Sequence, residues 1–165
     1  MILIGLGANL PSAEFGPPPA SLDAALRMLQ QSGVVVLARS RWYRTAPVPA
    51  SDQPWFVNGV AAVETALDPA ALLTLMQSIE THFGRVRRER DAARVLDLDL
   101  LDYAGRVSEG GAPLLTLPHP RLTERAFVLL PLAEVAPGWR HPATGMGLDE
   151  LLRHLPMGQA VKLLA

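Results

Sequence analysis

The chain has 165 residues, of which 49% are hydrophobic and 19% charged. That is enough apolar material for the core of one domain, and it excludes disorder as the main state. The net charge of -1 creates no field that would draw the protein onto nucleic acid or a membrane, and no apolar run approaches the ~18 residues of a membrane span. The absence of cysteine excludes disulfides, thiolate catalysis and cysteine-ligated metals. We expect one cytoplasmic domain over residues 1–165, acting as a monomer.

The first half of the chain predicts three strands and one helix. Residues 2–7 form an apolar run that ends at glycine, which is typical of a buried strand. Ser21 has the position of a helix N-cap, and apolar residues then recur at helical spacing until Gly33. Residues 34–43 and 56–65 are rich in β-branched residues or alternate with polar ones, which predicts two strands separated by a proline-rich loop.

The second half predicts another helix and strand, followed by smaller elements. Asp68 and Pro69 are typical of a helix start, and the apolar spacing predicts a helix that ends near Gly84. Residues 85–94 are polar and basic without periodicity, so we expect a loop there, followed by a strand over 95–103. The last predicted elements are a hairpin and two helices, over 105–117, 123–132 and 148–154.

The first six elements follow the order β-α-β-β-α-β, which predicts an α+β, ferredoxin-like core. In that core both helices cover one face of an antiparallel sheet. The C-terminal hairpin and helices are then available to cover the other face. This order alone implies no function, because the fold supports many.

Asp97 and Asp99 are the strongest local signal for chemistry. Residues two apart in a strand share a face, so their carboxylates point the same way, roughly 6.5–7 Å apart along the chain. Neighbouring carboxylates repel each other, and Mg2+, which binds a few carboxylates together with substrate phosphates, removes that repulsion. The alternative from this motif alone is a half-exposed strand with an acidic face.

The segment directly before these aspartates, residues 84–94, carries five arginines. A run of charge is often only a solvated loop. Here its position favours a site where guanidinium groups meet metal-bound oxygens, which is the equipment of phosphoryl transfer. We expect the segment to be a mobile lid that closes over bound substrates.

Two further groups of residues suggest ligand contacts. His119, Arg121 and Arg125 are close together in the sequence, which is typical either of a helix start with surface arginines or of an anion site. Trp55 and Phe56 are adjacent, so only one of them faces the core of a strand. The other is available to stack on a planar ligand whose heteroatoms the nearby asparagine would bind, or it lies beneath a loop.

Taken together, these segments resemble the 6-hydroxymethyl-7,8-dihydropterin pyrophosphokinase family of folate biosynthesis. The resemblance extends almost end to end and is most specific at residues 94–99 (Arg-Val-Leu-Asp-Leu-Asp) combined with residues 118–121 (Pro-His-Pro-Arg). It implies a ferredoxin-like fold and an enzyme that transfers pyrophosphate from ATP to the hydroxymethyl group of the pterin, releasing AMP. The implied partners are these two small molecules, without nucleic acid or membrane.

The resemblance also implies a role for each matching position. Asp97 and Asp99 would hold two Mg2+ ions that bridge the ATP phosphates, and Arg85 and Arg94 would stabilise the migrating charge. The residues implied to hold the triphosphate are Arg87, Arg94, His119 and Arg125. Those implied to lie near the nucleoside are Gln77, Glu80, Leu98 and Thr116. The pterin slot would be formed by Thr45, Pro47, Phe56, Asn58 and Phe127, with the two phenylalanines sandwiching the ring.

One departure from the family pattern keeps an alternative open. Before the last arginine of the basic loop the family typically has an aromatic residue followed by Gly-Pro, whereas this chain has Asp91-Ala92-Ala93. A non-catalytic relative that binds pterin or nucleotide therefore remains an alternative. A ferredoxin-like RNA-binding module is a further one, opposed by the aromatic content of 5% and by acids where its base-stacking platform would be.

Overall fold

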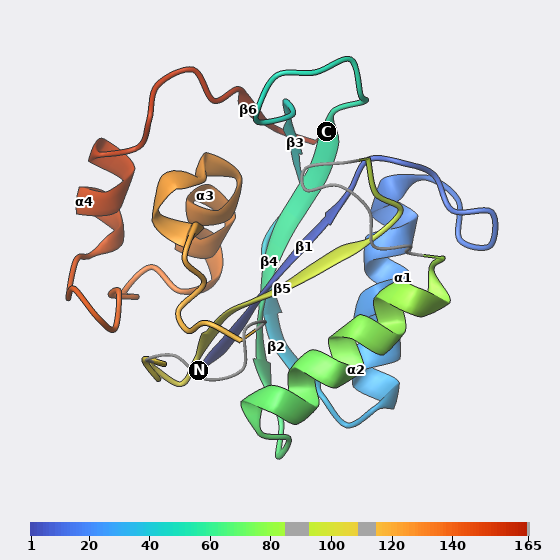
Figure 1. Cartoon of the computed structure of the whole chain (residues 1–165), viewed down its shortest axis with the longest axis horizontal. Helices are drawn as coiled ribbons and strands as arrows, with labels where there is room; N and C mark the ends of the chain where they lie inside the picture. Colours follow the sequence, from blue (N-terminus) through green and yellow to red (C-terminus); the bar gives the residue numbers. More distant parts are fainter. Residues whose placement is uncertain (85–92, 109–114, 165) are drawn as a thin grey trace.

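The computed structural model describes residues 1–84, 93–108 and 115–164. Within these residues six strands form one sheet, and α-helices lie on both of its faces (Figure 1). The strands are β1 (Ile2–Ala8), β2 (Val35–Arg39), β3 (Tyr43–Thr45), β4 (Phe56–Glu64), β5 (Asp97–Tyr103) and β6 (Val161–Leu163). The helices are α1 (Pro18–Gln31), α2 (Pro69–His82), α3 (Ala126–Val135) and α4 (Leu148–Arg153), with a 3-10 turn, η1, at Leu122–Glu124.

The sheet has the strand order of a ferredoxin-like core. Strands β5, β1 and β4 are neighbours, β2 and β3 both pair with β4, and β6 adds to the far side of β3. Every pair is antiparallel. Taken as one interrupted strand, β2 and β3 complete the predicted order β-α-β-β-α-β, so the predicted fold class is confirmed.

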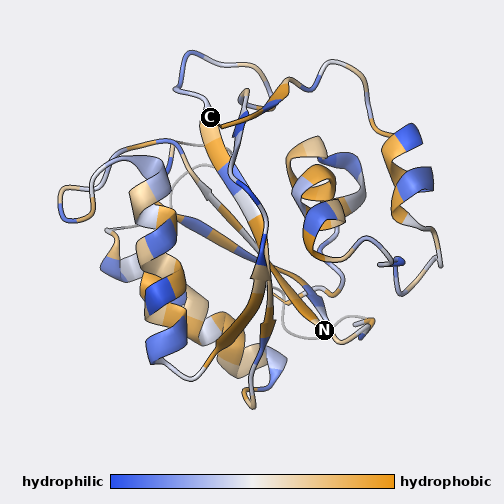
Figure 2. Cartoon of the chain, turned by 180° about the vertical axis from the view of Figure 1, so that it is seen from behind, coloured by the Kyte–Doolittle hydropathy of each residue, from blue (hydrophilic) through white to orange (hydrophobic). Residues whose placement is uncertain are grey.

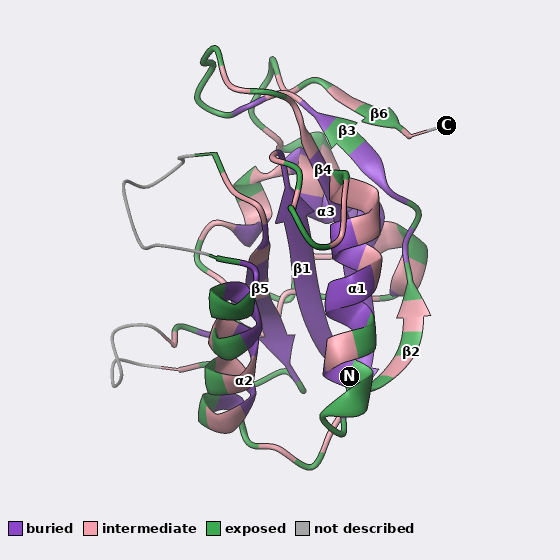
Figure 3. Cartoon of the chain, turned by 90° about the vertical axis from the view of Figure 1, so that its right-hand side faces the viewer, coloured by how far each residue is buried: buried purple, intermediate pink, exposed green. Residues whose placement is uncertain are grey.

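The sheet separates two hydrophobic cores, because side chains alternate between its faces. On one face Ile4 and Leu6 of β1 pack against α1 and α2. On the other, Leu3, Val60 and Leu101 pack with the apolar residues of α3 and α4. Strand β1 is accordingly buried along its whole length (Figure 3). In Figure 2 apolar residues are prominent in the strands of the sheet, and polar residues recur along the helices. In the described part of the chain no helix is long and apolar enough to cross a membrane.

The prediction of one long strand over residues 34–43 is wrong, because the structure has two strands there, β2 and β3. The Ser40 hydroxyl accepts a hydrogen bond from the backbone N–H of Val60 at 2.9 Å. A side chain thus takes a place in the ladder that a backbone carbonyl would hold. The ring of Trp42 lies so close to Gly59 that a Cβ there would be 2.4 Å from it. These two contacts fill the break between the strands.

Other boundaries also differ from the predictions. Helix α1 begins at Pro18, where proline at the first position needs no N–H partner, so Ser21 lies inside the helix and is not its cap. The helix predicted over 123–132 is interrupted by the extended backbone of Arg125, which separates η1 from α3. Strand β6 was not predicted.

The described residues of the predicted hairpin at 105–117 contain no strand, but Ser108 joins its two ends: the Ser108 N–H donates to the Leu117 carbonyl at 3.0 Å, and the Leu117 N–H donates to the Ser108 hydroxyl at 2.7 Å. Residues 109–114 and the predicted lid residues 85–92 lie outside the described residues. The predictions for β1, β4, α2, β5 and α4 are confirmed within a few residues. In α2 the Asp68 carboxylate caps the Ala71 N–H at 2.8 Å, as expected from its position.

Glu134 of α3 fastens this helix to the sheet at β3. Its carboxylate accepts hydrogen bonds from the Tyr43 hydroxyl, from the Arg41 backbone N–H at 2.9 Å and from Arg41 Nε at 3.2 Å. Burial acts to raise the pKa of Glu134, but the hydrogen bonds from Tyr43 and Arg41 outweigh it and lower the pKa below its ordinary value of 4.5. Burial and the same carboxylate raise the pKa of Tyr43 to about 12.

We expect Glu134→Gln to lower the free energy of unfolding by about 1–3 kcal/mol at pH 7, because the buried Tyr43 hydroxyl and the Arg41 donors lose a charged acceptor. The folded-state pKa lies below the unfolded one, so this stabilisation is present above pH 4.5 and is lost as the pH falls through the folded value. The difference in the free energy of unfolding between wild type and variant should therefore become smaller as the pH is lowered. Urea unfolding at pH 7 and pH 3 measures it, with the exposed Glu64→Gln as the control. A difference that stays the same at both pH values would contradict the role of the charged Glu134 carboxylate.

Candidate active site

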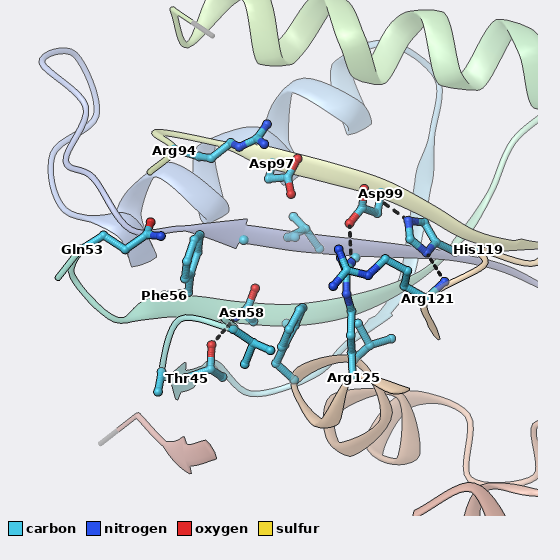
Figure 4. A pocket seen from close by; sticks show the side chains of 18 of the residues that line it. Thr45, Gln53, Phe56, Asn58, Arg94, Asp97, Asp99, His119, Arg121 and Arg125 are labelled. Carbon is cyan, nitrogen blue, oxygen red and sulfur yellow. Dashed lines mark hydrogen bonds and ion pairs between the residues drawn. The ribbon is translucent and has the colours of Figure 1, made fainter. Parts of the chain in front are cut away.

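A cavity of about 290 Å³ lies on the α3 face of the sheet, above strands β1, β4 and β5 (Figure 4). Its walls come from the loop after β3, from residues 119–121 and from the beginning of α3. Segments far apart in the sequence therefore meet there. Most of the residues singled out from the sequence that the structure describes lie in this cavity: Thr45, Phe56, Asn58, Arg94, Asp97, Asp99, His119, Arg125 and Phe127.

The strand register arranges the floor of the cavity in rows. Gly7 of β1 pairs with Asn58 of β4 on one side and with Asp97 of β5 on the other. Paired residues point to the same face, so these three form one row, and Gly5 with Asp99 begins the next. A Cβ on Gly7 would lie 2.5 Å from Asn58 Oδ1, so only glycine leaves the floor open here. Glycines two apart in a buried strand are a sequence signal for such a close approach.

One end of the cavity is charged. Asp97 and Asp99 both line it, which confirms that they share a face of β5. Asp99 lies 3.9 Å from His119 Nε2 and 4.0 Å from a guanidinium nitrogen of Arg125 (Figure 4). Arg94 and Arg121 line the same cavity, so three arginines share it with the two aspartates. This arrangement suits a polyanion bound together with a cation.

His119 is neutral at physiological pH and donates from a fixed nitrogen. Burial, followed by the positive charge of Arg125, lowers its pKa from 6.5 to about 4. The Arg121 backbone N–H donates to His119 Nδ1 at 3.1 Å, so the ring proton resides on Nε2. Since Nε2 faces Asp99, the imidazole presents a neutral N–H donor at the charged end of the cavity.

The other end of the cavity is lined mainly by uncharged residues. Asn58 and Thr45 are buried, and the Asn58 amide donates to the Thr45 hydroxyl at 2.6 Å. Phe56 and Phe127 contribute their rings to the same region. The guanidinium carbon of Arg125 lies 5.3 Å from the centre of the Phe127 ring, a cation–π distance. The charged end and the aromatic end are thus in direct contact.

Asn9, which is not among the predicted site residues, connects two walls of the cavity. It is only 3% exposed, and its amide nitrogen donates to Gln53 Oε1 at 2.8 Å and to the Pro54 carbonyl at 2.9 Å. Its Oδ1 accepts from the Arg94 backbone N–H at 2.7 Å. Gln53 and Arg94 are thereby fixed on the cavity wall by one buried amide. A polar residue directly after a buried strand was the available signal.

Some predicted site residues lie elsewhere. Arg85 and Arg87 are outside the described residues, and their roles stay predictions. Glu80 and Leu98 are brought together, since the buried Glu80 carboxylate accepts from the Leu98 N–H at 2.9 Å. The described residues predicted for the site but absent from the cavity lining are Pro47, Gln77, Glu80, Leu98 and Thr116. Lining residues given no role from the sequence include Gly5, Gly7, Gln53 and Gly59, whereas Arg121, one of the residues considered for an anion site, does line the cavity.

The chain is similar to known proteins over most of its length. The family model described as 7,8-dihydro-6-hydroxymethylpterin-pyrophosphokinase (HPPK) matches residues 3–137. A 2-amino-4-hydroxy-6-hydroxymethyldihydropteridine pyrophosphokinase of Methylorubrum extorquens is 46% identical over 136 residues, 81% of each chain. An enzyme of the same name from Pseudomonas aeruginosa is 42% identical over 94% of this chain and 91% of its own.

Among solved structures, a Plasmodium falciparum HPPK-DHPS chain superposes with a TM-score of 0.69 at 14% identity. The match covers 92% of this chain and 43% of that one, and it supports the fold. The match to the family model and the identity to its named relatives, together with the fold, lead to one assignment. The chain belongs to the 7,8-dihydro-6-hydroxymethylpterin-pyrophosphokinase family.

Proposed function

We propose that this chain transfers pyrophosphate from ATP to the hydroxymethyl group of 6-hydroxymethyl-7,8-dihydropterin, releasing AMP, in a Mg2+-dependent step of folate biosynthesis. The observation that carries the proposal is one cavity lined by two carboxylates, by arginine side chains, by a buried amide and by two phenylalanine rings. Membership of the family supports the same reaction. We also propose that the chain works as one domain, since both hydrophobic cores pack on a single sheet.

The aromatic end has the features that a pterin requires. A pterin is flat, so the rings of Phe56 and Phe127 offer stacking surfaces. Its edge carries both hydrogen-bond donors and acceptors, which match the amide of Asn58 and the hydroxyl of Thr45. These two groups are buried, so a ligand that left them unsatisfied would bind poorly. The pair therefore selects the heterocycle, and its hydroxymethyl group would extend toward the charged end.

The charged end fits a magnesium triphosphate. Asp97 and Asp99 are two adjacent oxygen donors, the number of carboxylates that Mg2+ takes when phosphates and water complete its shell. We propose that these aspartates hold two Mg2+ ions. Bound Mg2+ would neutralise phosphate oxygens and orient them.

The reaction then needs positioning more than covalent chemistry. The hydroxymethyl oxygen forms a bond to the β-phosphorus of ATP, and the bond from that phosphorus to the oxygen shared with the α-phosphate breaks. AMP leaves with the electron pair of that bond, and the hydroxyl proton is released. Arg94 and Arg125 line the end where negative charge would move, and the His119 Nε2–H would donate to a phosphate oxygen. No side chain has to form a covalent intermediate.

An assay for AMP tests the proposal. Purified chain is incubated with ATP, Mg2+ and 6-hydroxymethyl-7,8-dihydropterin, and nucleotides and pterins are separated by chromatography and mass spectrometry. We expect AMP and diphosphorylated pterin in equal amounts, and neither product without the pterin or with excess EDTA. Pterin binding by calorimetry without any AMP would support a non-catalytic relative, and AMP formation without pterin would indicate a nucleotide hydrolase.

A further inference from the structure

Gln159 lies beyond the residues that match the family model, yet it contacts the backbone on both sides of Arg125. Its Oε1 accepts a hydrogen bond from the Ala126 N–H at 2.9 Å, and its Nε2 donates to the Glu124 carbonyl at 2.8 Å. Nε2 also donates to the Pro156 carbonyl of its own segment at 3.3 Å. One carboxamide from near the C-terminus therefore brackets a residue that lines the cavity.

Arg125 occupies the junction between η1 and α3, where its carbonyl accepts the Leu129 N–H at 3.0 Å. The backbone leaves η1 there and begins α3, with extended angles of φ -113° and ψ 110°. The first N–H groups of a helix need outside partners, and the Arg125 side chain makes no capping hydrogen bond. The Gln159 amide takes that place for Ala126 from a distant part of the chain. Gln159 thus gives the backbone on each side of Arg125 a hydrogen-bond partner from outside the junction.

The segment that carries Gln159 is itself anchored to the sheet. The Ala160 carbonyl accepts from the Ala46 N–H at 3.0 Å, beside the cavity residue Thr45. Strand β6 pairs with β3, and the Leu164 N–H donates to the Trp42 carbonyl at 2.9 Å. Residues 159–164 therefore connect the wall at Thr45 with the junction at Arg125.

We propose that Gln159 is a positioning residue for the reaction, because its carboxamide holds the backbone around Arg125 so that the guanidinium faces the charged end of the cavity. The side chain of Arg125 is only 16% exposed there and reaches to 4.0 Å from Asp99. The inference rests on the proposed function in treating Arg125 as a ligand of the triphosphate. It extends the site into a part of the chain that the family match does not include.

A double-mutant cycle tests this dependence. Gln159→Met keeps the length of the side chain and removes its hydrogen bonds, and Arg125→Met removes the guanidinium. We expect Gln159→Met to weaken binding of inorganic tripolyphosphate with Mg2+ by about tenfold in calorimetry. In the Arg125→Met background the same change should have less than about a twofold effect. In the enzyme assay Gln159→Met should raise KM for ATP more than it raises KM for the pterin.

Met157→Ala is the matched control, because Met157 belongs to the same segment and its side chain is 98% exposed. It should bind tripolyphosphate like the wild type. If Gln159→Met fails to fold, Gln159→Asn, whose amide is one methylene too short, replaces it in the cycle. An equal loss in both backgrounds, or no loss at all, would overturn the proposal. The tripolyphosphate cycle needs no turnover, so a wild type that forms no AMP refutes the proposed function separately.

Discussion

Asp97→Ala and Asp99→Ala should each lower AMP production by about three orders of magnitude while leaving the fold intact. Both side chains line the cavity, so their removal takes no apolar contact from either core. What each variant loses is an oxygen donor for Mg2+ at the place where the triphosphate must be neutralised. The effect should appear in kcat for AMP release measured at saturating ATP and pterin.

A folding measurement separates this loss from instability. In the absence of metal the two carboxylates repel each other, but they also share the cavity with arginines, so the two effects oppose each other and each variant should unfold at nearly the same urea concentration as the wild type. Asp149→Ala, an exposed aspartate in α4, is the control and should retain full activity. Near-normal AMP production by either cavity variant would remove the aspartates from the metal site.

Asn58→Ala should weaken pterin binding by about 1–3 kcal/mol and leave the affinity for a non-hydrolysable ATP analogue nearly unchanged. The amide is buried and bonded to the Thr45 hydroxyl at 2.6 Å, so it is held ready for a ligand edge. Truncation leaves the polar edge of the pterin without that partner. Calorimetry with each ligand alone measures the two affinities, and a loss confined to the nucleotide would contradict this role.

Gly7→Ala tests the role of the Asn58 amide in a second way, without changing Asn58 itself. The added methyl would start 2.5 Å from Asn58 Oδ1, so the side chain must move and pterin affinity should fall as it does in Asn58→Ala. Gly5→Ala is the matched comparison, because its methyl would meet only Leu101 at an ordinary distance of 3.5 Å. Its pterin affinity should stay much closer to that of the wild type. Equal losses in the two variants would argue for general damage to β1.

The sequence predicts those features that local periodicity controls. The alternation around Asp97 and Asp99 placed both carboxylates on one face, and Asp68 with Pro69 marked the start of α2, because these patterns act within a few residues. The individual roles of the site residues came from the resemblance to a family. Neither source placed the cavity residues relative to one another, which required the register of β1 with its two neighbours.

The features that were not predicted depend on contacts between distant segments. Strand β2 ends where the Ser40 hydroxyl bonds to β4, and α3 begins late where Gln159 takes the Ala126 N–H. Strand β6 is a three-residue strand whose partner is β3. No pattern within such short segments distinguishes them from loop, so their structure follows from tertiary hydrogen bonds that a linear reading does not contain.

The pairing of β5 with β1 links the chemistry of the site to the opposite side of the sheet. Leu98 and Leu100 face the core beneath α1 and α2, while the aspartates between and before them face the cavity. A slip of β5 by one residue would bury both carboxylates in hydrocarbon and turn the leucines toward bound phosphate. The free energy gained by burying these leucines therefore stabilises the strand register that keeps Asp97 and Asp99 in the cavity. A substitution at Leu98 or Leu100 would therefore alter catalysis, although neither side chain lines the cavity.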